Sequence, residues 1–217
     1  AKWYKRALMA APGDSSTLNA IGVLYERLGQ PDIAHQYQLA VRDRDPLNSQ
    51  YAINLALSHW RQGEFDAARE QLDRARRIAP DAIRVQVFEA LFAFLEGDYE
   101  SAVRLSEKLN RVLFGCALHK MGRPEEARDV LEELRSASSP GATNIAILYG
   151  CLNDKNNAFA WLQRAYEDHD ASLRWLRGNL AIESLQDDPR WEALLQKVGV
   201  SDAHAQLVTD MLGNLGL

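Results

Sequence analysis

Two groups of residues in the sequence have side chains that bind metals or transfer protons. Cys116 and His119 are three residues apart, and Cys151 follows further along the chain. Thiolate and imidazole are zinc ligands, so these three residues would form a metal site if the fold brought them together. Free cysteines are more often small, buried, apolar side chains. We therefore expect both cysteines to be structural and expect no metal site.

The second group is the titratable run from Glu167 to Asp170, which contains His169. We expect this run at a turn between helices, where helix capping and solvation account for such residues. The chain has no phosphate-binding glycine loop, no His-Glu-x-x-His zinc helix, no Gly-x-Ser-x-Gly turn and no Cys-x-x-Cys pair. The sequence therefore predicts a protein that is not an enzyme and needs no cofactor.

Composition narrows the kind of partner. The 217 residues are 47% hydrophobic and carry a formal charge of -5, which allows a folded core but gives no basic surface for nucleic acid. The apolar stretches 88–95 and 145–152 are shorter than the roughly 18–20 residues of a membrane span.

Two cysteines far apart in the sequence favour a reducing compartment, the cytoplasm, with the periplasm as the alternative. Because the chain begins at Ala1 within a predicted helix, we expect the natural N-terminus to lie upstream.

The elements that position these residues follow from an internal repeat. Three kinds of residue recur every 34 positions: Pro12, Pro46 and Pro80; Gly29, Gly63 and Gly97; and Ala34, Ala68 and Ala102. Proline ends one helix, and glycine reaches the left-handed conformation that closes a helix C-terminus. Asp66 and Asp98 place negative charge near the start of the next helix. The pattern predicts pairs of helices joined by short turns.

Small residues fall at matching positions in the first helix of each pair: Gly22, Ala56, Ala90, Gly115 and Ala146. Glycine inside a helix costs about 1 kcal/mol relative to alanine. We therefore expect Gly22 and Gly115 to lie where a neighbouring helix leaves no room for a side chain.

Block 49–80 resembles a tetratricopeptide repeat (TPR). The resemblance rests on Leu55, Ala56, Gly63, Phe65, Ala68, Leu72, Ala75 and Pro80. Similar blocks span 15–46, 83–109, 111–137 and 142–168, while 1–12 resembles only the second helix of a preceding repeat. The resemblance implies an all-α fold, a superhelix or solenoid of antiparallel helix pairs, with about five units over 15–168 and a C-terminal capping helix.

One repeat step is shorter than the others. Gly97 and Gly122 are only 25 residues apart, and no proline lies between them. Either the second helix of the third repeat runs almost directly into 111–121, or a natural loop is missing from this chain.

The C-terminal part carries a second resemblance. The runs 149–154, 158–166 and 185–191 are similar to the ending of bacterial TPR regions in multidomain regulators, which implies a regulatory parent protein. Pro189, after Asp187 or Asp188 as N-cap, predicts the first turn of a short helix. We expect residues 173–198 to form a cap that covers the last repeat.

The TPR resemblance also implies a concave groove lined by the first helices, where ligands usually bind. The positions that match the family's groove residues are Asn19, Val23, Arg27, Ile53, Leu57, Trp60, Arg61, Arg84, Val87, Leu91 and Phe94. Trp60 and Phe94 are one repeat apart, and two interpretations stay open: contact with an apolar ligand side chain, or packing within the core. The composition of the groove favours an apolar or amphipathic partner segment.

Two segments are candidates for self-association. Residues 201–217 form an amphipathic tail, which would dock on its own chain, pack on the cap or join two chains. The helix at 1–8 lacks its partner helix and is expected to expose apolar surface.

The sequence thus predicts a protein-interaction scaffold that binds a peptide or helical segment of another protein. The alternative is a sensor module of a larger bacterial signalling or transcription regulator.

Overall fold

The computed structural model describes residues 1–137 and 141–212 and contains only helices within them. By internal contacts the chain divides into unit 1, residues 1–85 with 199–217, and unit 2, residues 86–198. The sequence did not predict this division. No helix in the described ranges is both long and apolar enough to cross a bilayer.

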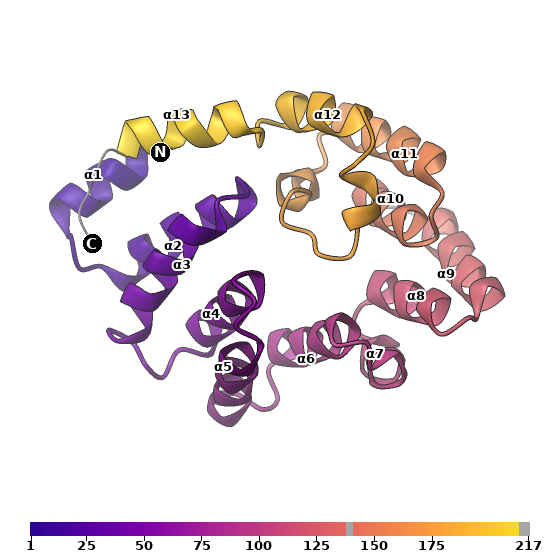
Figure 1. Cartoon of the computed structure of the whole chain (residues 1–217), viewed down its shortest axis with the longest axis horizontal. Helices are drawn as coiled ribbons and strands as arrows, with labels where there is room; N and C mark the ends of the chain where they lie inside the picture. Colours follow the sequence, from indigo (N-terminus) through magenta and orange to yellow (C-terminus); the bar gives the residue numbers. More distant parts are fainter. Residues whose placement is uncertain (138–140, 213–217) are drawn as a thin grey trace. The chain divides into compact units, whose positions relative to one another are not determined.

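Unit 1 contains two complete helix pairs, one unpaired N-terminal helix and the C-terminal helix (Figure 1). Its helices are α1 (Lys2–Ala10), α2 (Ser15–Arg27), α3 (Pro31–Arg42), α4 (Ser49–Arg61), α5 (Phe65–Ile78) and α13 (Asp202–Leu212). Helix α2 packs on α3, α3 on α4, and α4 on α5. Each helix therefore packs against the next one along the chain, as in a solenoid.

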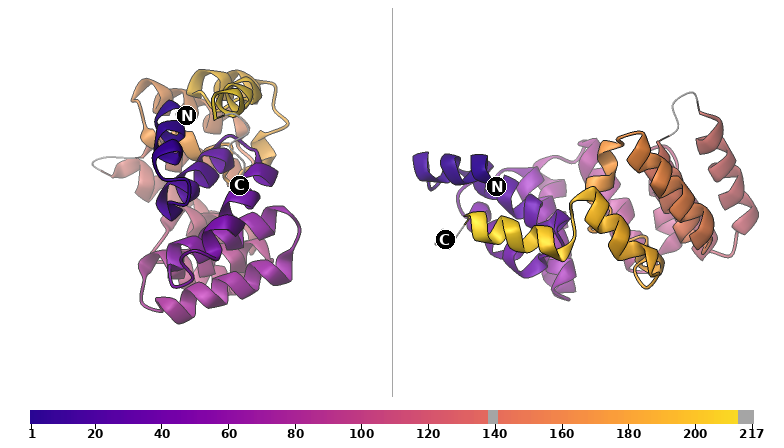
Figure 2. Two further views of the ribbon diagram at one scale, coloured as in Figure 1. Left: turned by 90° about the vertical axis from the view of Figure 1, so that its left-hand side faces the viewer. Right: turned by 90° about the horizontal axis from the view of Figure 1, so that it is seen from above.

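Helix α6 (Ile83–Leu95) begins in unit 1 and ends in unit 2. The other helices of unit 2 are α7 (Tyr99–Ser106), α8 (Arg111–Lys120), α9 (Pro124–Ser136), α10 (Ala142–Cys151), α11 (Lys155–Glu167), the 3-10 helices η1 (Ala171–Trp175) and η2 (Glu183–Leu185), and α12 (Arg190–Val198). Helices α8 and α9 form one pair and α10 and α11 the next, and α8 also packs against α10. Figure 2 shows these helices from two further sides.

The turns within the pairs have the predicted glycine conformation. Gly29, Gly63 and Gly97 have φ of 68°, 77° and 83°, respectively. After α2 the Gln30 N–H donates to the Tyr25 carbonyl at 2.9 Å, the hydrogen bond that closes a helix in the Schellman motif. Asn153, with φ of 62°, takes the place of glycine between α10 and α11. Asparagine tolerates this conformation better than most residues, so the turn survives without glycine.

The predicted close approaches at Gly22 and Gly115 are confirmed. A Cβ at Gly22 would lie 2.6 Å from Gln38 Nε2, and one at Gly115 would lie 2.8 Å from Leu148 Cδ1. Both neighbours are buried side chains. Alanine at either position would overlap an occupied core site, which explains why glycine is found inside these helices.

The short repeat step corresponds to a short helix. Helix α7 has only eight residues, and Asn110 ends the connection by accepting a hydrogen bond from the Leu113 N–H at the start of α8. The second helix of this pair thus runs almost directly into the next pair, as the first of the two interpretations expects.

The C-terminal residues 171–198 bury a set of large apolar side chains: Leu173, Leu176, Ile182, Leu185, Trp191, Leu194 and Leu195. Asp188 accepts a hydrogen bond from the Arg190 N–H at 3.0 Å, so the predicted N-cap is Asp188. Within the predicted run 167–170, Asp170 accepts hydrogen bonds from the N–H groups of Ser172 and Thr143. Its role in capping agrees with the interpretation made from the sequence.

The N-terminal helix is covered by the C-terminal helix. Helix α13 packs against α1, and Leu212 belongs to the same core cluster as Leu8. Trp3 and Met9 on α1 remain 76% and 70% exposed. The tail therefore docks on its own chain, one of the three predicted arrangements, and residues 213–217 of the predicted tail lie outside the described part of the chain.

Candidate functional site

The predicted groove residues lie on the first helices of three pairs. Asn19, Val23 and Arg27 are on α2; Ile53, Leu57, Trp60 and Arg61 are on α4; Arg84, Val87, Leu91 and Phe94 are on α6. The positions up to Arg84 belong to unit 1, and the last three belong to unit 2. The structure thus brings the α2 and α4 residues together in one unit, and we describe that surface by itself.

Exposure divides the predicted residues into two kinds. Ile53 and Phe94 are only 1% and 8% exposed, so they are core residues. In unit 1 the apolar residues of the set that remain half-buried are Val23, Leu57 and Trp60. We call these three residues the α2–α4 surface, because they are the apolar side chains of the predicted set in unit 1 that a partner can reach.

Polar contacts hold α2 against α4 beside this surface. The Asn54 side-chain N–H donates to Asn19 Oδ1 at 2.8 Å, and Gln50 donates to Asn54 Oδ1 at 2.8 Å. Arg61 Nε lies 2.8 Å from Glu26 Oε2, with side chains only 16% and 14% exposed. Two residues predicted as ligand contacts, Asn19 and Arg61, therefore also join neighbouring repeats.

Burial determines the electrostatics of this ion pair. Desolvation raises the pKa of Glu26 above its ordinary value, and the nearby Arg61 guanidinium opposes the shift. The raised pKa means that the protein stabilises the ionised carboxylate less well than water does. The pair is consequently a specific contact between repeats with a cost in desolvation.

Both aromatic residues of the predicted ladder pack within their own helix pair. The Trp60 ring lies 4.7 Å from the Phe65 ring, and the Phe94 ring lies 5.6 Å from the Tyr99 ring, measured between centroids. In each case the contact joins the end of a first helix to the start of the second. Since Trp60 is still half-buried, contact of its ring with a ligand stays a prediction.

The cysteines differ from the expectation. Cys116 on α8 and Cys151 on α10 form a disulfide with Cα atoms 5.3 Å apart, so the expectation of free cysteines is wrong. Neither thiol is then available with His119 for a metal site. The sequence did contain a signal, because both cysteines lie on first helices of successive repeats, where side chains from neighbouring helices meet.

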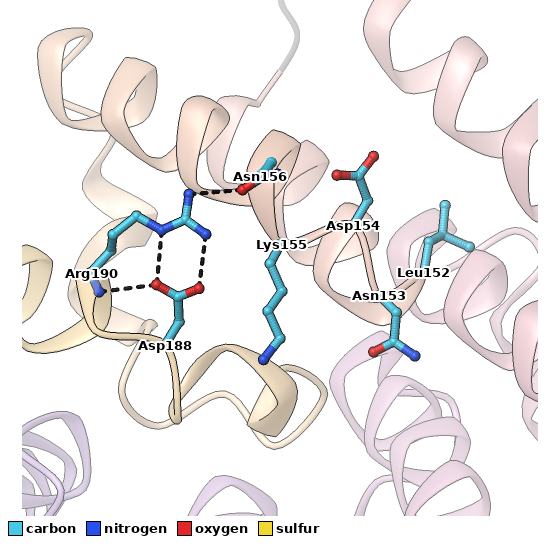
Figure 3. A pocket seen from close by; sticks show the side chains of 7 residues that line it. All are labelled: Leu152, Asn153, Asp154, Lys155, Asn156, Asp188 and Arg190. Carbon is cyan, nitrogen blue, oxygen red and sulfur yellow. Dashed lines mark hydrogen bonds and ion pairs between the residues drawn. The ribbon is translucent and has the colours of Figure 1, made fainter.

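A pocket lies in unit 2, where the cap meets the start of α11. It has a volume of about 510 Å³ and is lined by residues 152–156 with Asp188 and Arg190. Figure 3 shows the guanidinium of Arg190 reaching both Asp188 and Asn156, at 2.8 Å and 3.2 Å. Arg190 also lies over the Phe159 ring, 4.3 Å from its centroid. These contacts attach the cap to α11.

Comparisons with known proteins agree with this architecture. Family models described as tetratricopeptide repeat match residues 19–83 and 115–133. These two stretches of the chain are therefore tetratricopeptide repeats. No curated protein matches its sequence.

Solved structures show the same fold as this TPR protein. A tetratricopeptide repeat protein from Parabacteroides merdae is similar with a TM-score of 0.63 and 18% identity, over 83% of this chain and 75% of that chain. Yeast Tom70 is similar with a TM-score of 0.51 and 20% identity, over 89% of this chain but only 45% of that chain. The structure named MamA MSR-1 C2 has 25% identity and a TM-score of 0.46, over 73% and 98%. The likeness to the first two structures shows the fold alone.

Helix α13 also contributes to the core around α1. Val208 and Leu212 of α13 pack in the core cluster that contains Leu8. The C-terminal helix thus covers apolar surface of α1 within unit 1.

Proposed function

We propose that this TPR protein is a scaffold that binds a peptide or helical segment of another protein through its first helices. Tetratricopeptide repeats are a protein-interaction fold that typically lacks catalytic activity. The observation that carries the proposal is the α2–α4 surface, where apolar side chains one repeat apart remain accessible on neighbouring first helices. Burying such side chains against a partner is the main favourable term in most protein association.

The chemistry of the surface defines the class of partner. Val23, Leu57 and Trp60 offer apolar contacts, while Arg27 lies half-buried one helical turn from Val23. A segment with apolar residues on one side and acidic residues beside them fits this combination. An amphipathic helix or an extended apolar peptide, bound without a cofactor, is the proposed ligand.

A peptide display library selected against the full chain tests this proposal. We expect the selected peptides to be apolar or amphipathic and to lose about tenfold in affinity with Leu57→Ser, because burial of a leucine contributes about 1.5–3 kcal/mol. Leu47→Ser is the matched control, since Leu47 is 78% exposed in the turn between α3 and α4, outside the proposed surface. Circular dichroism of both variants checks that the helices are intact.

The outcomes distinguish the proposal from binding elsewhere. Peptides that bind Leu57→Ser, Val23→Ser and the wild-type chain with one affinity would place the binding surface outside α2 and α4. Equal losses for Leu57→Ser and Leu47→Ser would mean that the effect reports general surface hydrophobicity.

The regulatory alternative stays a prediction. Its support is the C-terminal ending, whose large apolar residues are buried in the cap. The genomic sequence that flanks this chain tests it: a DNA-binding or cyclase domain in the same reading frame would support a sensor module, and a chain of repeats alone would contradict it.

A further inference from the structure

Three potential metal ligands that are not part of the α2–α4 surface meet in unit 1. They are His35 on α3, His59 on α4 and Glu64 immediately before α5, and one ligand atom from each lies within 4.8 Å of the others. His59 is 8% exposed, whereas the Glu64 side chain is 52% exposed. The His59 side of the cluster is therefore buried, and the Glu64 side is open to solvent.

Hydrogen bonds already orient both imidazoles. His35 Nδ1 lies 2.9 Å from Ser58 Oγ, and His59 Nδ1 lies 2.5 Å from Glu64 Oε2. The two rings meet edge to face with centroids 4.8 Å apart. The bond to Ser58 holds His35 Nδ1 and leaves the Nε2 of His35 for a metal, and such partners are typical of the surroundings of protein metal sites. Because His59 and Glu64 are both potential ligands, a bound ion would take the place of the hydrogen bond between them.

We propose that His35, His59 and Glu64 bind a divalent transition-metal ion of the zinc class. Two nitrogens and one oxygen favour Zn²⁺, Co²⁺ or Ni²⁺ over Mg²⁺ and Ca²⁺, which prefer oxygen ligands alone. A water molecule completes a four-coordinate site.

The ligand atoms, which lie within 4.8 Å of one another, need to move only a short distance closer together to bind one ion. Zinc binds nitrogen at about 2.0–2.1 Å, so two donors on one tetrahedral ion lie about 3.4 Å apart. The Glu64 side chain, which is 52% exposed, supplies most of the movement as its hydrogen bond to His59 is exchanged for a bond to the ion. The bound ion would join α3 of one repeat to α4 and α5 of the next, and would stabilise unit 1 by mass action.

Zinc titration of the full chain without reductant tests the site. Calorimetry measures the binding, and thermal unfolding measures the stability of the chain with and without zinc. Reductant is omitted because it would free Cys116 and Cys151, which bind zinc as thiolates. We expect one ion per chain and a rise in the Tm of unit 1. Cobalt in place of zinc is expected to show the visible absorption of a tetrahedral site.

Three variants decide the assignment. His35→Gln with His59→Gln, and separately Glu64→Gln, are expected to weaken zinc binding at least about tenfold. Glu64→Gln changes an exposed residue, so it tests the site even if the histidine variant unfolds. His169→Asn is the control, since His169 is exposed with φ of 53°, a conformation asparagine tolerates.

Two results would overturn the proposal. One is a wild-type chain that binds no zinc in the micromolar range. The other is zinc affinity that is unchanged in the histidine double variant and in Glu64→Gln.

Discussion

The interface between successive first helices is built differently in the two units. In unit 1, Glu26 on α2 and Arg61 on α4 form a largely buried ion pair. In unit 2, Cys116 on α8 and Cys151 on α10 form a disulfide, beside the close contact of Gly115 with the next first helix. Both links join residues 35 apart in the chain, about one repeat. Successive first helices can thus be joined by an ion pair in one unit and by a disulfide in the other.

The difference shows that the repeat motif does not define the contact between repeats. Motif residues form each helix pair and its turn, whereas the links between first helices use positions that vary from repeat to repeat. We therefore expect the two units to respond to different conditions: unit 2 to reduction and unit 1 to pH. Stability in a solenoid is roughly a sum over repeats and their interfaces, so such effects stay local.

The largest expected effect is the loss of the disulfide. Cys116→Ser with Cys151→Ser is predicted to destabilise unit 2 by about 2–4 kcal/mol, because the open chain gains entropy on unfolding. Hydrogen exchange measured by mass spectrometry gives the protection of the amide groups in α8 and α10 separately from that in α2 and α4. Reductant should reproduce the effect in the wild-type chain and add nothing in the double variant. Equal loss of protection in both units would contradict the local response.

The next effect concerns the interior glycines. Gly115→Ala is predicted to cost about 1–3 kcal/mol, because its Cβ would lie 2.8 Å from the fully buried Leu148. Gly22→Ala should cost less, since it meets the end of the Gln38 side chain, which can rotate. Urea unfolding measures both. Gly13→Ala is the control, because a Cβ there contacts nothing within 4 Å. A larger loss at Gly22 would show that the contact between α2 and α3, where Gly22 meets Gln38 and Tyr37, is tighter than the contact between α8 and α10.

The smallest effect is the pH response of the buried ion pair. The pKa of Glu26 is raised above 4.5 by burial, so the folded state binds its proton more tightly than the unfolded state does. This contribution to stability is complete below pH 4.5 and is lost as pH rises through the folded pKa. Glu26→Gln should remove that loss, so its stability relative to wild type should increase with pH.

Urea unfolding at pH 4 and pH 7 measures the difference. Glu125→Gln is the matched control, because Glu125 pairs with Arg128 at the surface with its side chain 81% exposed. If Glu26→Gln and Glu125→Gln show the same pH dependence, burial is not the cause of the effect at Glu26.

The parts of the fold that follow local rules were predictable. The turn at Gly63 and the close approach at Gly115 each depend on one residue type and one backbone conformation. The N-cap at Asp188 was placed to within two residues for the same reason. The helix pairs follow from the 34-residue spacing, since each repeat of a solenoid forms the same helix–turn–helix unit.

The exposure of the candidate surface was predicted only in part. Family positions identified Val23, Leu57 and Trp60, which remain accessible, but the same positions included Ile53 and Phe94, which are buried. Position in a motif specifies a face of a helix, while exposure depends on the side chains of the neighbouring repeats.

The sequence by itself determined the all-helical repeat, its turns and its caps, because these depend on residues close together in the chain. Only the tertiary structure decided the pairing of Cys116 with Cys151, the meeting of His35 with His59, and the docking of α13 on α1. The physical reason is that each of these contacts joins different helices. Their formation depends on the packing of whole repeats, which no single repeat encodes.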